Sequence, residues 1–214
     1  MRSPLRPLLF AALAALAAPV IGQDTSLTGT IEIPAGPQLC GLFGSHGVAD
    51  TNVRLFSNDV DLDDYLFENV RIVGNMVAGA CPTIEVLSVE FADTRFSHCN
   101  EPAQGCPLAL DFCPSPGTGS FLIFASPQPG YFPVSLEIGT FLLNPSQFVL
   151  LASGQHPEIC HTVEVQVSLP PALVGARFFL QALNSAPLAG IQLTNVQSLT
   201  IGPPSVVCGS SICF

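Results

Sequence analysis

Hydrophobic and polar residues alternate along several short segments of the chain, and this period of two predicts β-strands. The clearest case is HTVEVQVSL at residues 161–169. There, Val163, Val165 and Val167 alternate with polar residues. The segment TIEVLSVEF at residues 83–91 likewise has one apolar and one polar face. Such segments are expected to be strands that cover a core with one face and meet water with the other.

Other short apolar segments are rich in β-branched and aromatic residues and are bounded by turn residues. The chain holds 18 glycines and 20 prolines, which recur every few residues and leave no room for a long helix. The predicted strands form a first group at residues 26–33, 52–56, 69–77 and 83–91, and a second group at 120–125, 134–143, 147–152, 161–169, 177–183, 189–194 and 196–201. The sequence therefore predicts an all-β protein, and the spacing of the second group indicates a β-sandwich.

The N-terminus has a different pattern, an unbroken apolar run. Residues 8–18 read LLFAALAALAA and follow Arg2 and Arg6. This run is much shorter than the roughly 20 residues that cross a bilayer, so it predicts a cleaved signal peptide rather than a transmembrane segment. We expect cleavage before Gln23, with cleavage after Ala18 as the alternative. The mature chain is then expected to be secreted, extracellular or at the cell surface.

The charge of the chain excludes one class of partner. The sequence has 6 basic and 16 acidic residues, a formal net charge of −10, and no lysine. Two of the arginines lie in the apolar leader. Because nucleic-acid binding depends on clustered Lys and Arg side chains, we expect no nucleic-acid partner.

The segment at residues 62–74 reads LDDYLFENVRIVG. It resembles the small OB-type barrels of secreted bacterial proteins, which often carry the pattern L-D-x-Y-x-G-x-x-V-x-V-x-G. The matching residues are Leu62, Asp63, Tyr65, Val70, Ile72 and Gly74, and Phe67 replaces the usual glycine. The resemblance implies a small OB-like barrel for the first group of strands. It does not carry over the nucleic acids or sugars that OB folds often bind, because residues 26–91 are strongly acidic.

The segment at residues 171–202 reads PALVGARFFLQALNSAPLAGIQLTNVQSLTIG. It is similar to the C-terminal part of a set of secreted bacterial β-proteins that end in the pattern P-x-L-V-G-x-x-F-x-x-Q … L-T-N-x-x-x-L-T-I-G. The matching residues are Leu173, Val174, Gly175, Phe178, Gln181, Leu193, Thr194, Asn195, Leu199, Ile201 and Gly202. The resemblance implies an architecture of closing strands and no activity. Within it, we expect Asn195 to occupy a left-handed turn.

Together these observations predict an all-β chain with a small OB-like barrel followed by a β-sandwich, stapled by disulfides. The expected divisions are a signal peptide at 1–22, the OB-like β-barrel at 23–98, a linker rich in Cys, Pro and Gly at 99–119, the β-sandwich at 120–204 and a disulfide-closed tail at 205–214.

Eight cysteines follow the leader, and an exported chain favours disulfides over free thiols. Eight cysteines can pair in 105 ways, so their connectivity does not follow from the sequence. Our preferred pairing is Cys40 with Cys81, Cys99 with Cys106, Cys113 with Cys160, and Cys208 with Cys213. A zinc site is the alternative, but the chain has no C-x-x-C motif. The neighbours His98–Cys99 and Cys160–His161 also lack the usual ligand spacing.

The strongest candidate for a metal site is an acidic run that would bind calcium through Asp59, Asp61, Asp63 and Asp64. Acids at alternate positions are typical of calcium loops. However, Asp64 stands where such loops have glycine, and Val70 stands where they have a bidentate glutamate. In the other interpretation, Leu62, Tyr65 and Leu66 pack inward from a helical turn while the aspartates face solvent and help to start the turn.

The search for enzymatic residues selects none. Ser45 and His46 are neighbours in Gly-Ser-His-Gly, an arrangement that rarely gives a nucleophile and its base, and Phe43 breaks the G-x-S-x-G elbow. His156 is expected in a surface turn. Glycan platforms rely on Trp and Tyr, and the chain has no Trp and only Tyr65 and Tyr131.

Three functions remain after this search. We expect a secreted or cell-surface structural or interaction module, without catalysis or cofactor, that binds an unknown protein or glycan at the cell surface. The alternatives are a glycan- or calcium-binding extracellular module and, third, a secreted hydrolase.

Overall fold

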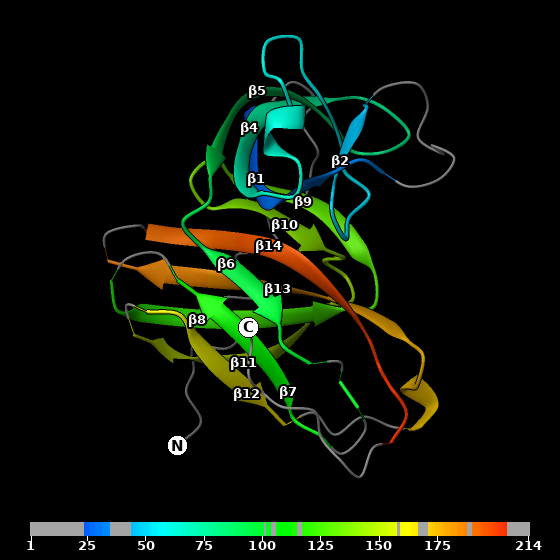
Figure 1. The fold of residues 1–214 in the computed structure, drawn as a ribbon, viewed down its shortest axis with the longest axis vertical. Coiled ribbons are helices and arrows are strands. Elements are labelled where there is room, and N and C mark those ends of the chain that lie inside the picture. The colour runs from blue at the N-terminus through cyan, green and yellow to red at the C-terminus, as the bar shows by residue number, and fades with distance from the viewer. Residues whose placement is uncertain are drawn as a thin grey trace.

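The computed structural model describes residues 24–34, 44–100, 102–103, 106–114, 117–157, 159–166, 171–187 and 190–204. In Figure 1, a barrel lies at the top of the molecule and a pair of packed sheets lies below it. The regular structure of these ranges is β-strands and two short 3₁₀ helices. They include no helix that is long and apolar enough to cross a membrane. The expected all-β fold with a barrel is therefore confirmed.

The first five strands close into a barrel in the order β1-β2-β3-β5-β4. Their bounds are β1 Asp24–Glu32, β2 His46–Val48, β3 Arg54–Phe56, β4 Asn69–Val77 and β5 Thr83–Phe91. Neighbouring strands are antiparallel except for β3 and β5, which are parallel. The alternating apolar residues fill the interior, and Leu27, Leu55, Ile72 and Ile84 are fully buried there. This is the small barrel that the first group of strands predicted.

The connection between β3 and β4 packs against the barrel core with a short 3₁₀ helix, η1 (Asp63–Tyr65). Leu62 is buried, and Tyr65 and Leu66 pack against the barrel core. Phe67, which follows, has a φ of +65°. It stands where the OB-type pattern carries glycine, the residue that adopts this left-handed conformation without steric cost. The backbone therefore keeps the shape that a glycine would favour, although the side chain is a phenyl ring.

The second part of the chain forms two facing sheets. A three-stranded sheet has the order β12-β7-β6, and a four-stranded sheet has the order β11-β8-β13-β14. The bounds are β6 Arg95–His98, β7 Leu108–Cys113, β8 Gly119–Ser126, β11 Val149–His156, β12 His161–Val165, β13 Arg177–Ala186 and β14 Gly190–Thr200, with η2 at Pro171–Leu173. One core joins the two sheets, with Phe96, Leu110 and Phe112 on one side and Ile123 and Leu180 on the other. This is the sandwich.

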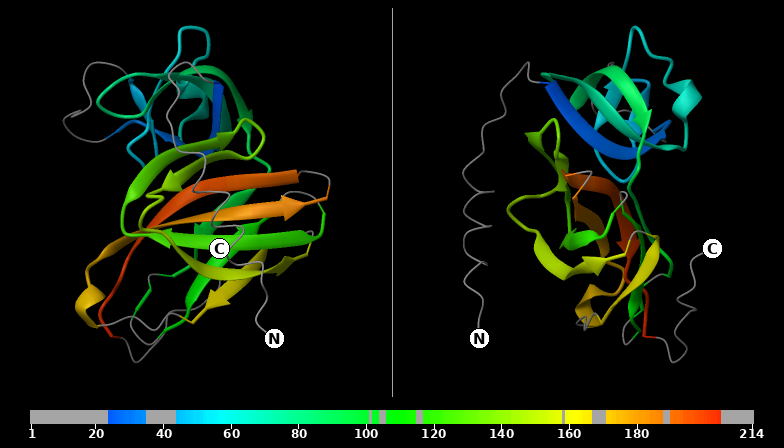
Figure 2. Two further views of the ribbon diagram at one scale, coloured as in Figure 1. Left: turned by 180° about the vertical axis from the view of Figure 1, so that it is seen from behind. Right: turned by 90° about the vertical axis from the view of Figure 1, so that its left-hand side faces the viewer.

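The other face of the four-stranded sheet is covered by a hairpin of β9 (Pro129–Ser135) and β10 (Gly139–Leu143). Phe124 of β8 and Phe141 of β10 meet edge to face, with ring centroids 5.6 Å apart. Both rings belong to the same core cluster as the barrel interior. The barrel interior therefore continues into the core under this hairpin, on one face of the four-stranded sheet, whereas the core between the two sheets is a separate cluster. Figure 2 shows the barrel, the hairpin and the sheets from two further sides.

Polar contacts also join the two parts along β1. The hydroxyls of Thr25 and Tyr131 are 3.0 Å apart. Ser26 donates to the carbonyl of Leu136 at 2.6 Å, and Thr140 donates to the carbonyl of Ser26 at 2.6 Å. These bonds tie the first strand of the barrel to the β9–β10 hairpin.

A second polar contact starts from the turn between β2 and β3. Asp50 has a φ of +60° there. Its carboxylate accepts hydrogen bonds from the guanidinium of Arg177, at 2.8 Å, and from the backbone N–H of Ser198, at 2.9 Å. Because Arg177 and Ser198 belong to β13 and β14, this carboxylate fastens the barrel to the four-stranded sheet.

The structure differs from the predicted divisions between the barrel and the sandwich. Residues 95–98 were assigned to the barrel and residues 99–119 to a linker, but β6 and β7 lie in these ranges and form two strands of the sandwich. Strand β7 was not predicted because its short sequence, LALDFC, is flanked by glycine, proline and cysteine, which indicated a linker. Its residues Leu108, Leu110 and Phe112 are nevertheless buried.

Three strand predictions were also wrong in detail. The single strand expected at 134–143 is the β9–β10 hairpin, and the two strands expected at 189–194 and 196–201 are the single strand β14. Asn195 accordingly lies inside β14 and is buried, not in a turn. Its side chain is held by hydrogen bonds to another strand, which removes the need for a turn.

The expected bridge between Cys113 and Cys160 is present and links β7 to the residue before β12. Cys81, Cys99 and Cys106 are also disulfide-bonded. Cys40, Cys208 and Cys213 lie outside the described residues, as do the expected signal peptide at 1–22 and the tail at 205–214.

Candidate functional site

A chain of two hydrogen bonds joins three polar residues of the barrel. The hydroxyl of Ser45 lies 2.8 Å from Nδ1 of His46, and Nε2 of His46 lies 3.0 Å from a carboxylate oxygen of Asp63. His46 begins β2 and Asp63 begins η1, so the closure of the barrel brings them together. Although they are neighbours in the sequence, Ser45 and His46 are in hydrogen-bond contact, directly after Gly44 with its φ of +108°.

The surroundings of this chain favour a structural role over catalysis. Asp63 keeps 70% of its side chain exposed, whereas His46 keeps 10%. Water therefore screens the carboxylate, and the ion pair that forms when His46 is protonated is a weak one. Ser45 also lies at the exposed surface and does not line either of the two cavities described below. The contact holds η1 against β2.

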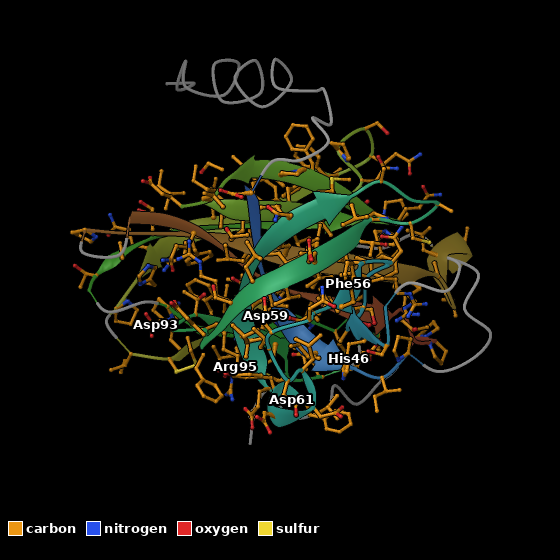
Figure 3. The ribbon with its side chains drawn as sticks, turned by 90° about the horizontal axis from the view of Figure 1, so that it is seen from above. His46, Phe56, Asp59, Asp61, Asp93 and Arg95 are labelled. Carbon is orange, nitrogen blue, oxygen red and sulfur yellow. A yellow bond between two sulfur atoms is a disulfide. The ribbon has the colours of Figure 1, made fainter. Side chains whose placement is uncertain are left out.

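The aspartates of the calcium hypothesis do not converge. All four side chains are exposed, and Asp63 is engaged with His46. In Figure 3, Asp59, Asp61 and His46 are labelled on the barrel. Within the described ranges, no group of three His, Cys, Asp or Glu side chains lies close enough to hold a metal ion. The packing of Leu62, Tyr65 and Leu66 agrees with the other interpretation, a helical turn whose aspartates face solvent.

Large apolar side chains gather instead at one end of the barrel. Ile33, Phe67 and Phe91 are 61%, 76% and 67% exposed. The N–H of Phe67 donates to the carbonyl of Ile31 near the end of β1, and Phe91 is the register partner of Val70 at the start of β4. The three side chains therefore lie where β1 and β5 end and β4 begins. We call Ile33, Tyr65, Phe67 and Phe91 the barrel-end patch.

The patch includes one packed aromatic pair. The rings of Tyr65 and Phe91 have centroids 5.9 Å apart and are tilted by 53°. Tyr65 is half-buried against the barrel core and supports the exposed Phe91 ring. Tyr65 is fixed by η1, so this part of the patch has a defined shape.

A small charged cleft begins beside Phe91. It has a volume of about 60 Å³ and lies between the barrel, the turn of the β9–β10 hairpin and β14. Its charged lining residues are Arg71, Glu90, Asp93 and Glu137. The guanidinium of Arg71 donates to the carbonyl of Leu136 at 2.5 Å. The cleft is too small for a ligand of ordinary size, and its polar groups form a rim next to the patch.

Two groups at the barrel–sandwich junction have shifted pKa values. Burial, followed by the negative charge of Asp50, raises the pKa of Glu32, although Arg54 and Arg177 oppose the shift. Burial also raises the pKa of the Tyr131 hydroxyl, opposed by its hydrogen bonds with Thr25 and Thr140. Both groups therefore favour the protonated form more than they would in water.

The polar residues of the C-terminal pattern are structural. Gln181 is fully buried, and its amide donates to the carbonyls of Thr140 and Thr194 and accepts from the N–H of Leu142. It therefore fixes the β9–β10 hairpin on one face of the four-stranded sheet. On the other face, Asn195 bonds to the backbone of Phe96 in β6. These polar residues of the pattern therefore hold the strands and the hairpin in place.

Sequence reasoning did not find the barrel-end patch. The only local signal was Phe67, the departure from the OB-type pattern. Ile33 and Phe91 come at the ends of strands that look ordinary in the sequence, and only the register brings them beside Phe67.

The chain is thus an all-β protein with a small closed barrel, a sandwich packed against it through the β9–β10 hairpin, and exposed apolar residues at the barrel end. No protein-family model matches the chain, and no curated protein matches its sequence.

Proposed function

We propose that the protein is an exported interaction module, without catalysis, that binds a protein partner through the barrel-end patch. The observation that carries this proposal is the gathering of Ile33, Phe67 and Phe91 at one end of the barrel, each more than 60% exposed. Soluble proteins rarely expose contiguous large apolar surfaces unless a partner covers them.

The composition of the patch favours a protein over a glycan. Exposed Phe side chains fill apolar pockets of a protein partner, and aromatic residues are enriched in the cores of protein interfaces. The charged residues of the neighbouring cleft, Arg71, Glu90 and Asp93, supply the polar rim that such interfaces have. Replacement of Phe67 and Phe91 by small polar residues should therefore remove most of the binding energy, because a few residues at the centre of an interface usually supply most of that energy.

The test compares two double variants of the exported protein. Phe67→Ser with Phe91→Ser removes the patch. Val149→Ser with Leu150→Ser removes two exposed apolar residues of β11, 59% and 42% exposed, and serves as the control. Each variant is immobilised and exposed to envelope and extracellular proteins of the source cells. The captured proteins are quantified by mass spectrometry, and the purified partner is then titrated.

The patch variant should lose the partner, with an affinity lower by at least roughly tenfold, while the control retains it. Equal binding by the wild-type protein and the patch variant would contradict the proposal. Loss of binding in the control alone would place the interface on the sandwich instead.

A further inference from the structure

Two histidines of the sandwich lie side by side without the hydrogen bonds that buried histidines normally make. His156 ends β11 and His161 begins β12. Their rings have centroids 6.4 Å apart and planes 27° apart. In the four-stranded sheet, β14 is the edge strand that contacts the barrel, and β11 is the opposite edge strand. The histidine pair therefore lies away from the barrel-end patch.

Two phenyl rings hold the histidine pair. Phe112 contacts both imidazoles edge to face, with centroids 5.6 Å from His156 and 5.9 Å from His161. Phe121 packs on Phe112 and on His161. His161 is the register partner of Phe112. Their neighbours in the sequence, Cys160 and Cys113, are joined by a disulfide, so the position of His161 is fixed.

Three of the four ring nitrogens of this pair are buried and have no hydrogen-bond partner among the described residues. Nδ1 of His156 lies 3.0 Å from the carbonyl of Pro157, which can only accept, so Nδ1 carries the proton and Nε2 carries a lone pair. Among the described residues, Nε2 of His156 and both ring nitrogens of His161 have no hydrogen-bond partner. His156 is only 2% exposed. A buried polar group without a hydrogen-bond partner destabilises the fold, so these nitrogens indicate a site for a ligand.

A third unsatisfied side chain lies on the same face. Asn184 is fully buried, and neither atom of its amide has a partner within the described residues. It is the register partner of Phe121, which contacts His161.

A cavity gives access to His156 from solvent. Its volume is about 370 Å³, and Thr118, Gly119, Ser120, Gln155 and Pro157 line it together with His156. A Cβ at Gly119 would clash with the carbonyl of Ser185 and would lie 2.7 Å from Nε2 of His156. Only glycine therefore fits at this position beside the free nitrogen.

We propose that His156 and His161 together bind one transition-metal ion, and that monovalent copper fits the site best. A metal–nitrogen bond is about 2.0–2.1 Å, and a ring nitrogen lies about 1.2 Å from its centroid, so one bridging ion sets two centroids roughly 5–6.5 Å apart. The observed 6.4 Å lies within this range. Among the described residues, no third His, Cys, Asp or Glu joins the pair, and two imidazole ligands alone suit Cu⁺ better than Zn²⁺, which takes four ligands.

The lack of charged side chains at the site also favours Cu⁺. Neither the two histidines nor the two phenyl rings that contact them, Phe112 and Phe121, carry a carboxylate or a thiolate. The ion must therefore keep its own charge in an apolar setting, where the cost of desolvation rises with the square of that charge. A monovalent ion is consequently favoured over a divalent one.

The test titrates the intact, disulfide-bonded protein with Cu⁺ under anaerobic conditions, against a chromogenic Cu⁺ chelator. Ascorbate serves as the reductant, because a thiol would reduce the disulfides. Zn²⁺ is titrated separately. The variants are His156→Gln and His161→Gln, and His46→Gln of the barrel is the control with the same loss of one imidazole. Circular dichroism checks that each variant is folded.

We expect one Cu⁺ per chain and Zn²⁺ affinity at least roughly tenfold weaker. Each sandwich variant should lose more than roughly 100-fold in Cu⁺ affinity, since loss of even an outer-shell partner costs 10–100-fold. The His46 variant should bind as the wild type does. In the wild-type protein, nuclear magnetic resonance should show that Cu⁺ shifts the ring nitrogens of His156 and His161.

Three results would overturn the proposal. They are the absence of stoichiometric Cu⁺ binding, Cu⁺ binding that leaves the ring resonances of His156 and His161 unchanged, and tighter binding of Zn²⁺ than of Cu⁺. The ring resonances are measured on the wild-type protein, so this test holds even if a variant fails to fold.

Discussion

The side chain of Asn195 bonds to both backbone groups of Phe96. Its Oδ1 accepts from the N–H of Phe96 at 3.0 Å, and its Nδ2 donates to the carbonyl of Phe96 at 2.8 Å. The amide thus pairs with β6 as a neighbouring strand would. Because Asn195 belongs to the four-stranded sheet and Phe96 to the three-stranded sheet, this contact joins the two sheets at a position where both residues are buried.

Loss of this contact should destabilise the sandwich. In Asn195→Ala, the N–H and carbonyl of Phe96 stay buried without a partner, and each such group costs about 1–3 kcal/mol. We therefore expect a loss of roughly 2–5 kcal/mol in the free energy of unfolding, measured by urea denaturation. Thr200→Ala, at the exposed end of the same strand, is the control and should stay within about 0.5 kcal/mol of wild type. An equal effect of the two changes would refute the role of Asn195.

Phe67 provides a test that separates stability from binding. Phe67→Gly and Phe67→Ala both remove the exposed ring, but only glycine adopts a φ of +65° without steric cost. The glycine variant should be the more stable of the two by about 1 kcal/mol, as thermal or urea unfolding would show. Both variants should bind the partner equally weakly. Equal stability of the two variants would contradict the left-handed backbone at this position.

Glu32 should make stability depend on pH. Its folded-state pKa is raised above the usual value of 4.5, chiefly by burial and next by Asp50. The folded state therefore holds this proton to higher pH than the unfolded state does. The resulting stability is fully present below the unfolded pKa and is lost as pH rises through the folded pKa.

Glu32→Gln removes this pH dependence, because the amide does not titrate. The melting temperature of the variant relative to wild type should therefore be higher at pH 7 than at pH 4. The matched control is Glu90→Gln, at an exposed position of β5 for which no such change is expected. A difference between variant and wild type that is the same at both pH values would contradict the raised pKa.

The Cys113–Cys160 disulfide should stabilise the end of the sandwich that holds the histidine pair. Replacing both cysteines with serine removes a cross-link between residues 47 positions apart. A loss of roughly 2–4 kcal/mol in the free energy of unfolding is expected, because the unfolded chain regains the freedom of this loop. Hydrogen exchange should locate the loosened backbone at β7 and β12. Exchange that increases first in the barrel would contradict this placement.

The histidine-pair site should also respond to this double serine variant. His161 follows Cys160, and its register partner Phe112 precedes Cys113, so the bridge limits the movement of both. Cu⁺ affinity should fall in the double variant even though both imidazoles remain. Unchanged affinity would mean that Phe112 and Phe121 are sufficient to position the rings.

The sequence by itself determined the class of structure. Alternation along segments such as 83–91 and 161–165 reflects local geometry, since a strand turns successive side chains to opposite faces. The same local information placed β4 and β5 at their observed bounds and indicated a sandwich in the second part of the chain, whereas the small barrel was expected from the resemblance of residues 62–74 to OB-type barrels. It also identified η1 as a turn that packs Leu62 inward.

Only the tertiary structure decided how distant segments meet. Strand register joined Ile33, Phe67 and Phe91 in one patch, and the packing of two sheets brought His156 beside His161. The same packing placed β6 and β7 in the sandwich, although their residues were expected in the barrel and the linker. It also buried Asn195, which was expected in a turn, and hydrogen-bonded its side chain to Phe96 of the facing sheet. Periodicity along a chain reports which face of a strand is buried, but not which strand lies beside it, because pairing depends on contacts between residues far apart in sequence.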